Sequence, residues 1–174
     1  MTCIVGLVEN GIVYVGGDSA ASDTDAVDVI INPKVFRNGD FLIGYTTSFR
    51  MGQLLQYKFS PPEHNRAEDT DIAYLITCFI DEVKKCFFDN SFGERGKGGT
   101  FLVGYNGNLY MVQSDFQVQQ YAQDFCAIGC GENWAIGALY VTKGQNPRSR
   151  VVLALETAST FSNAVRPPFT VLEM

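Results

Sequence analysis

Asn-Gly dipeptides lie between apolar runs at three places in the chain, and these constrain the fold most strongly. The three turns are Asn10-Gly11, Asn38-Gly39 and Asn106-Gly107. Asn-Gly between apolar runs is the strongest short-range signal for a β-hairpin, because both residues tolerate positive φ angles. The runs that these turns join are residues 3–8 with 12–15, 34–37 with 41–45, and 100–105 with 108–113. Three such hairpins predict antiparallel sheets, and residues 27–31 and 169–172 add two further apolar strands.

Helical periodicity replaces this alternation in four segments. The segments are residues 50–59, 71–89, about 131 to 144, and about 147 to 162. The second is the longest, and we expect Asp69 or Thr70 to cap it. Its predicted buried face consists of Ile72, Leu75, Ile76, Phe79, Ile80, Val83 and Phe87. The small polar residues 19–25 are expected to form a surface loop.

The order of these elements is strands, two helices, strands, two helices, and a closing strand. Ten or more short strands exceed what one sheet comfortably holds, and each pair of helices can cover one sheet face. We therefore predict an α+β fold, a four-layer αββα sandwich of two packed antiparallel sheets with helices outside. A length of 174 residues without a linker favours a single domain over residues 1–174.

Charge and cysteine content exclude several classes of protein. Thirteen basic and nineteen acidic residues give a net charge of −6, which argues against a nucleic-acid-binding surface. The five cysteines are odd in number and form no CxxC pair, so we expect free thiols in a cytoplasmic protein. No leader precedes the first strand, and no apolar run approaches the ~20 residues of a membrane span. No ligand spacing indicates a metal, and no cofactor is expected.

Thr2, Asp18 and Lys34 each lie at the end of an apolar strand. Removal of Met1 would leave Thr2 with a hydroxyl and a free α-amine, whose ordinary pKa of about 8 suits a general base. Lys34 would supply a cation beside this amine, and Asp18 would hold the cation in place. Such a site needs no histidine, and we expect the one histidine, His64, to be a solvated loop residue. The alternative is an ordinary edge strand, a turn-capping aspartate and a solvated lysine.

As a set, these residues resemble a known family. Thr2-Cys-Ile-Val5, Gly16-Gly-Asp18 and Asn32-Pro-Lys34 are similar to motifs of the proteasome β-subunit and HslV peptidases, which are threonine-dependent N-terminal-nucleophile hydrolases. The resemblance extends in order along the chain, through residues 41–45, 127–131, 154–158 and 169–172. It implies the N-terminal-nucleophile hydrolase fold, peptide-bond hydrolysis by Thr2 through an acyl-enzyme, and assembly into rings.

Three positions depart from the family pattern. Cys130 stands where the resemblance implies a serine that helps to manage the nucleophile's proton, and a thiol is a poorer hydrogen-bond partner. Thr47 lies in the segment that is usually glycine-rich and supplies the oxyanion donor, although its backbone N–H can still serve. Thr160 takes the place of an aspartate in the late helix. Cys3 alternates away from Thr2 and is expected to belong to the core.

For the substrate pocket, an extended segment 32–36 would place alternate side chains on one face. Asn32 and Phe36 would then flank Lys34 and bind substrate, although packing explains Phe36 equally well. Tyr45, which begins the altered oxyanion segment, is the third expected substrate-binding residue.

The leading hypothesis is a cytoplasmic threonine endopeptidase that forms a homo-oligomeric ring and receives peptides or unfolded proteins from an ATP-dependent unfoldase. The altered supporting positions leave a catalytically inactive ring or assembly component as an alternative. A small-amide hydrolase on the same fold is a third hypothesis.

Overall fold

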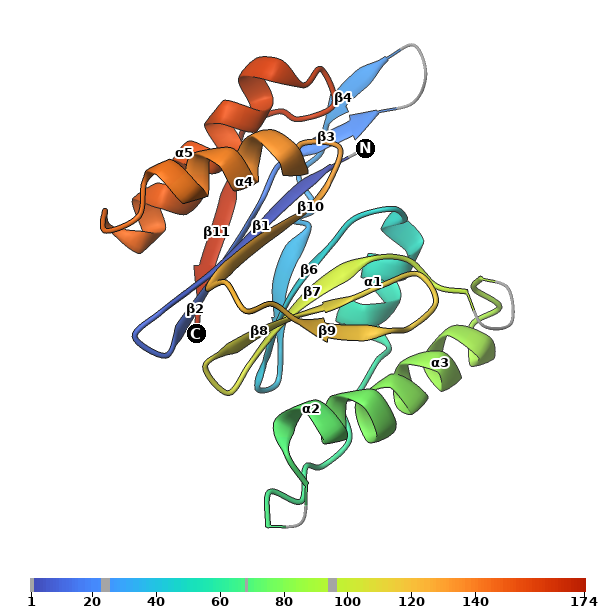
Figure 1. Cartoon of the computed structure of the whole chain (residues 1–174). Coiled ribbons are helices and arrows are strands. Elements are labelled where there is room, and N and C mark those ends of the chain that lie inside the picture. Colours follow the sequence, from blue (N-terminus) through green and yellow to red (C-terminus); the bar gives the residue numbers. More distant parts are fainter. Residues whose placement is uncertain (1, 23–25, 68, 94–96) are drawn as a thin grey trace.

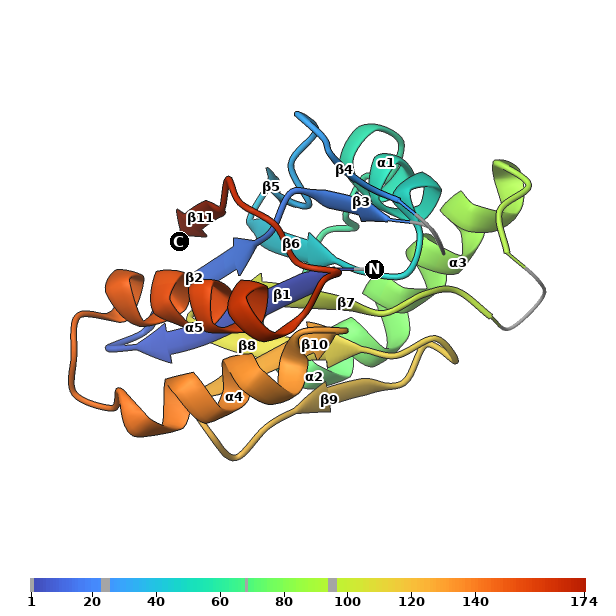
Figure 2. The same cartoon turned by 90° about the horizontal axis from the view of Figure 1, so that it is seen from above.

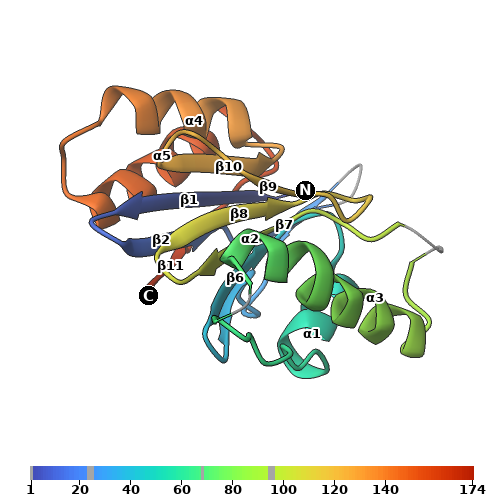
Figure 3. The same ribbon diagram turned by 60° about the horizontal axis from the view of Figure 1, so that its bottom comes forward.

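The computed structural model describes residues 2–22, 26–67, 69–93 and 97–174. Two antiparallel sheets pack face to face and each carries helices on its outer side, so the chain forms four layers (Figure 1). Figure 3 shows these layers in order, with α4 and α5 above, the two sheets between, and α1, α2 and α3 below. The predicted αββα sandwich is thus confirmed.

The first sheet contains the N-terminal hairpin at its centre and has the order β10-β1-β2-β11. Its strands are β1 (Cys3–Glu9), β2 (Ile12–Gly17), β10 (Phe125–Gly129) and β11 (Thr170–Glu173). Helices α4 (Glu132–Val141) and α5 (Pro147–Phe161) cover its outer face (Figure 2). The start of β1 is therefore tied down on both sides, by β10 and by β2.

The second sheet has the order β5-β6-β7-β8-β9 and packs on the first. Its strands are β5 (Val35–Asn38), β6 (Phe41–Tyr45), β7 (Phe101–Tyr105), β8 (Asn108–Val112) and β9 (Val118–Gln120). Helices α1 (Phe49–Tyr57), α2 (Asp71–Tyr74) and α3 (Ile80–Asp89) cover its outer face, with a π-helical turn, η1 (Leu75–Phe79), joining α2 to α3. Two of the three Asn-Gly turns have a positive φ at the asparagine, 53° at Asn10 and 49° at Asn106, whereas in the third turn only the glycine, Gly39, has a positive φ, of 57°.

Strand alternation divides the core into three apolar layers. Along β1, Cys3, Val5 and Leu7 face α4 and α5, whereas Ile4 faces the second sheet. A separate cluster, which includes Phe36, Tyr45 and Phe79, fills the space between the second sheet and α1–α3. Polar groups at the strand ends therefore lie at the margin of the inter-sheet layer, where a site can form.

Two details of the sequence prediction are wrong. Residues Ala20–Ser22, expected in a loop, form β3, which pairs with β4 (Val27–Val29) as a small separate sheet. Residues 23–25 of that expected loop lie outside the described residues. Ile76, expected on the buried face, is 52% exposed because the π-helical turn changes the phase of the long helix. The predicted cap at Thr70 is confirmed, since its hydroxyl accepts a hydrogen bond from the N–H of Ala73.

In the part of the chain that the structure describes, no helix combines the length and apolar character needed to cross a membrane.

Candidate active site

A buried ion pair joins the two charged residues singled out from the sequence. Lys34 Nζ lies 2.9 Å from Asp18 Oδ1, and both side chains are fully shielded from solvent. Three backbone N–H groups also donate to the Asp18 carboxylate: Cys3 to Oδ1 at 2.9 Å, and Ala20 and Arg166 to Oδ2 at 2.9 and 3.3 Å. Asp18 therefore fixes the first strand, β3 and the segment before β11 around one carboxylate.

Burial shifts the pKa values of Lys34 and Cys3 in opposite directions. Desolvation lowers the pKa of the Lys34 ammonium below its ordinary value, while the charge and hydrogen bond of Asp18 oppose this shift. The thiol of Cys3 is buried in the core, and desolvation together with the charge of Asp18 raises its pKa to about 12. Cys3 is thus a protonated core residue, as expected, and not a second nucleophile.

Thr2 lies next to this pair and contacts β10 on its other side. Thr2 is buried, with 4% exposure, and the next residue, Cys3, is paired in register with Gly129 of β10. A Cβ atom at Gly129 would lie 2.3 Å from the carbonyl oxygen of Thr2, and Gly129 has a φ of 96°. Only glycine fits this position without strain, because it combines a positive φ with a close backbone approach.

The turn between β6 and α1 has an unusual backbone at Thr47. Its φ is 77°, and the N–H of Ser48 donates to the carbonyl of Thr46 at 2.9 Å across it. This is the rare, strained form of the γ-turn. Within the described residues, no hydrogen bond uses the N–H of Thr47, whereas Thr46 N–H donates to the Thr100 carbonyl at 3.0 Å. Strain of this kind in a turn beside a candidate site is consistent with a functional constraint on that turn.

Cys130 follows Gly129 and faces solvent beside the same turn. A cavity of about 480 Å³ brings Cys130 together with Thr46, Thr47, Gly129 and Glu132. We call Asp18 and Lys34 the ion-pair wall, and residues 46–48 with 129–130 the turn wall. The two walls flank the start of β1.

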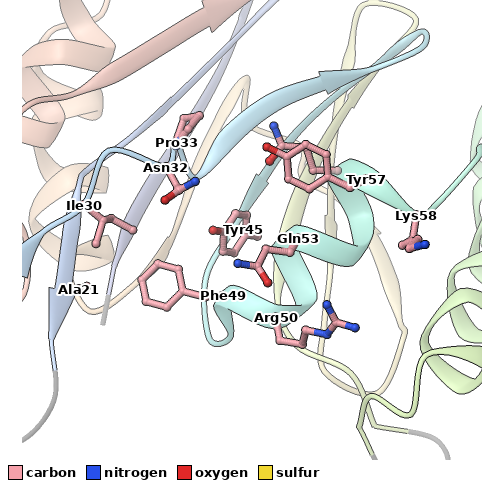
Figure 4. A pocket seen from close by; sticks show the side chains of 11 residues that line it. Ala21, Ile30, Asn32, Pro33, Tyr45, Phe49, Arg50, Gln53, Tyr57 and Lys58 are labelled. Carbon is pink, nitrogen blue, oxygen red and sulfur yellow. The ribbon is translucent and has the colours of Figure 1, made fainter.

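A second cavity, of about 400 Å³, lies on the other side of the β6–α1 turn (Figure 4). Asn32 and Tyr45 line it, as do Ala21, Pro33 and Phe49. Lys34 Nζ is 5.8 Å from the centre of the Phe49 ring, so this cavity adjoins the ion pair.

Phe36 does not line this cavity, contrary to the expected shared face of residues 32, 34 and 36. It is 4% exposed and packs against Tyr45 in the layer beneath α1. The segment bends at residues 31–34 and becomes a strand only at Val35, so the alternation does not continue from Asn32 to Phe36. Packing is therefore the role that the structure gives Phe36.

Two other residues singled out from the sequence lie outside this site, and one of them, His64, differs from its interpretation. The side chain of His64 is buried rather than solvated, at 4% exposure, and its ring stacks on Tyr74 at 4.2 Å. Its partners come from α2 and β7, which the local sequence does not reveal. Thr160 lies on the exposed surface of α5, and its hydroxyl donates to the Glu156 carbonyl at 2.9 Å.

Sequence reasoning missed three contributors to the site. The backbone N–H of Arg166 completes the Asp18 shell, and nothing in the local sequence before Pro167 indicated this role. Phe49 and Gln53, on the first turns of α1, line the cavity beside Tyr45. The predicted helix over residues 50–59 includes Gln53 and begins just after Phe49, and its periodicity gave no indication of a cavity.

No family model and no curated protein matches this sequence. Solved structures do match it in fold. Thiobacillus denitrificans BPH in complex with epoxomicin shares 17% identity with a TM-score of 0.83, covering 99% of this chain and 97% of that one. A eukaryotic HslV from Trypanosoma brucei shares 15% identity with a TM-score of 0.69, covering 98% of each chain.

Anbu, the ancestral beta-subunit, from Yersinia bercovieri gives a TM-score of 0.68 at 11% identity, covering 99% of this chain and 81% of that one. The chain has a proteasome-like fold. At such low identities the shared fold is all that these likenesses establish, so the chemistry of the site rests on the residues described above.

Proposed function

We propose that this chain is a threonine peptidase in which Thr2, freed of Met1, attacks peptide bonds. The observation that carries the proposal is the buried Asp18–Lys34 pair, held against the first strand by the hydrogen bond from Cys3 N–H to Asp18. A buried ion pair costs desolvation energy and is weak evidence for stability alone. Its position at the strand end next to a hydroxyl residue supports a chemical role.

In this mechanism the α-amine of Thr2 takes the proton of its own hydroxyl as the oxygen attacks the carbonyl carbon. The resulting ammonium returns the proton to the departing amine, which leaves an ester on Thr2. Water then attacks the ester, the amine again accepts the proton, and the hydroxyl is restored when the acid leaves. Lys34 lowers the pKa of the nearby hydroxyl and ammonium by its positive charge, while Asp18 orients it.

The turn wall would stabilise the transition state by hydrogen bonding. The N–H of Thr47, which no other described group binds, is the proposed donor to the oxyanion. The exposed Cys130 thiol beside Thr47 would contact the proton-transfer region in place of a hydroxyl, with weaker hydrogen bonds.

Mass spectrometry with an electrophile tests this function. The intact mass is expected to show loss of the initiating methionine, and epoxomicin is expected to add once, on Thr2. Thr2→Ala removes the nucleophile and should remain unmodified, whereas Thr2→Ser retains a hydroxyl and should still react. A processed protein that stays unmodified would overturn the proposal.

A catalytically inactive assembly component is the second candidate. The burial of Thr2 in the full chain favours it, since a nucleophile must reach its substrate. In this case Met1 remains attached, and the full-length mass is expected from a purified protein that still assembles.

We also propose that copies of the chain assemble, and that an unfoldase delivers the substrate. Several apolar side chains are exposed on β4 and its flank, on α4 and on α5: Val29, Ile31, Trp134, Tyr140, Val141 and Phe161. Apolar exposure of this kind is typical of surfaces that contact another protein. An Anbu complex from Pseudomonas aeruginosa, which matches in fold with a TM-score of 0.70, was solved as a helical assembly. Size-exclusion chromatography with light scattering tests assembly.

A further inference from the structure

The segment between α5 and β11, residues 162–169, contacts the ion-pair wall through the main chain of one arginine. We call this segment the strap. The N–H of Arg166 donates to Asp18 Oδ2 at 3.3 Å, and the Arg166 carbonyl accepts from the N–H of Ser19 at 2.9 Å. Figure 2 shows the strap leaving the end of α5, passing the start of β1 and returning to β11. The strap is therefore part of the shell that holds the Asp18 carboxylate, and with it Lys34.

Each oxygen of the Asp18 carboxylate accepts from two donors. Oδ1 accepts from Lys34 Nζ and from the N–H of Cys3, both at 2.9 Å. Oδ2 accepts from the N–H groups of Ala20 and Arg166, so the donors on this oxygen set the direction in which Oδ1 faces Lys34. The Arg166 hydrogen bond is the longest of the four, and it depends on how the strap is held. A shift of the strap would therefore turn the carboxylate away from the ammonium.

The side chain of Arg166 holds the strap in this position. Its Nη1 donates to the carbonyl oxygens of Ser162 and Val165, at 3.1 and 2.8 Å. Ser162 is the C-cap of α5, and the last turn of this 15-residue helix contains no basic residue. Carbonyl groups at a helix C-terminus carry partial negative charge and favour a cation. The guanidinium of Arg166 therefore supplies, from the strap, the cation that α5 itself lacks.

The charge of Arg166 is used on main-chain carbonyls rather than on an acidic partner. Among the residues that the structure describes, no carboxylate pairs with its guanidinium, whereas Arg150 of α5 pairs with Glu9 at 3.5 Å. Ser19 holds the strap at a second point, because its hydroxyl donates to the carbonyl of Pro168 at 2.6 Å. Two side chains thus fix the strap on either side of the Arg166 N–H that reaches the ion-pair wall.

We propose that Arg166 is a positioning residue for the reaction, and that it acts through Asp18 on the Lys34 ammonium. The inference rests on the proposed peptidase function. The guanidinium fixes the turn after α5, the fixed turn places the Arg166 N–H on Asp18 Oδ2, and the carboxylate keeps its other oxygen on Lys34. The charge and hydrogen bond of Asp18 raise the pKa of Lys34 against the effect of burial, so a displaced carboxylate leaves the cation less well supported.

Epoxomicin addition, followed by intact mass over a range of inhibitor concentrations, separates binding from reaction at Thr2. Arg166→Met keeps the length of the side chain and removes the guanidinium. Its limiting rate should fall about tenfold, since a hydrogen bond to a charged group contributes roughly that much. The concentration that gives half the limiting rate should stay within about twofold, because the strap lines neither cavity beside the site. Arg166→Lys restores a cation and should recover the limiting rate to within about threefold of the wild type.

Arg148→Met is the matched control, because Arg148 is exposed at the start of the same helix. It should react at the wild-type limiting rate. Ser19→Ala removes the second hydrogen bond to the strap and should lower the limiting rate about threefold. Val165, which is fully buried in the core beneath α5, should keep the strap attached in these variants.

The outcomes separate this role from a purely structural one and from the proposed function. Lower stability of Arg166→Met and Ser19→Ala with a wild-type limiting rate in both would overturn the positioning role and leave the peptidase function intact. An equal loss of rate in Arg166→Met and Arg166→Lys would likewise exclude the cation as its source. If Arg166→Met does not fold, a wild-type rate in Ser19→Ala overturns the role by itself. No adduct on the processed wild type would overturn the proposed function and the positioning role with it.

Discussion

The ion-pair wall and the turn wall flank the same N-terminal strand, but they are built in different ways. The ion-pair wall consists of two fully buried side chains whose hydrogen bonds are satisfied within the protein. The turn wall is formed largely by backbone in positive φ conformations, with Thr47 and Cys130 exposed. The charged pair can thus be held in place inside the protein, whereas hydrogen-bond donors that contact a substrate must remain accessible to it. Substitutions on the two walls should therefore differ in their effects on stability and on activity.

Removing one partner of the ion pair should produce the largest loss of stability. Lys34→Met keeps the length of the side chain but leaves a buried carboxylate without its cation. We expect a loss of about 3 to 5 kcal/mol in the free energy of unfolding. Urea unfolding followed by circular dichroism, at one fixed protein concentration, measures it.

The double variant Asp18→Asn with Lys34→Met is the control for this experiment, because it removes both charges. It should recover part of the lost stability while remaining unreactive toward epoxomicin. Equal stability of Lys34→Met and the wild type would show that the pair is not buried in solution.

On the turn wall, the largest effect is expected from Gly129→Ala. The new Cβ would overlap the Thr2 carbonyl oxygen at 2.3 Å and force a φ of 96° on a residue with a side chain. Strain of this kind costs about 3 kcal/mol. Gly137→Ala is the matched control, since its Cβ would meet nothing within 4 Å in α4. It should instead stabilise by about 0.5 to 1 kcal/mol, and a similar loss for both would argue against the close approach at Gly129.

Two buried thiols, those of Cys3 and Cys126, should make the free energy of unfolding fall at alkaline pH. The folded pKa values of Cys3 and Cys126 are raised from 9.0 to about 12, chiefly by desolvation. Between these values the unfolded chain releases protons that the folded chain retains, so stability falls as pH rises. Each thiol should remove about 1.4 kcal/mol by pH 10 relative to neutral pH.

The lowered pKa of Lys34 acts in the opposite direction, because the unfolded chain then holds the proton more tightly. The difference between wild type and Cys126→Ala therefore isolates one thiol. Urea midpoints at pH 8 and pH 10 should show a smaller decrease in the variant, and equal decreases would contradict the raised pKa of Cys126.

The same contrast explains how much of the site the sequence could predict. Asp18 and Lys34 could be found because each is a charged residue at the end of an apolar strand, and such ends converge at a sheet margin. The four layers could be predicted because the Asn-Gly turns and the helical periodicities are local signals. The chemical roles of Thr2, Asp18, Lys34, Thr47 and Cys130 remain predictions for the experiments above.

The remaining features depend on contacts between distant segments. The turn at Thr47 depends on the segment that leads into β7, since Thr46 N–H donates to the carbonyl of Thr100, the residue before that strand. The side of the sheet on which Phe36 lies depends on the bend before Val35, and a period of two cannot be extended through a bend. The strand at Ala20–Ser22 has a small, polar sequence and forms because it pairs with β4.

The smallest expected change comes from Thr47→Gly, and it separates the backbone of the turn wall from its side chain. Glycine removes the cost of a φ of 77° and keeps the N–H, at the expense of the weak hydrogen bond from Thr100 N–H to Thr47 Oγ1 at 3.4 Å. We expect a gain of about 1 kcal/mol in stability. The rate of epoxomicin addition should stay within about twofold of the wild type, because the proposed oxyanion donor is unchanged. A large fall in rate at unchanged or higher stability would assign the role to the threonine side chain instead, since only the side chain is lost in this variant.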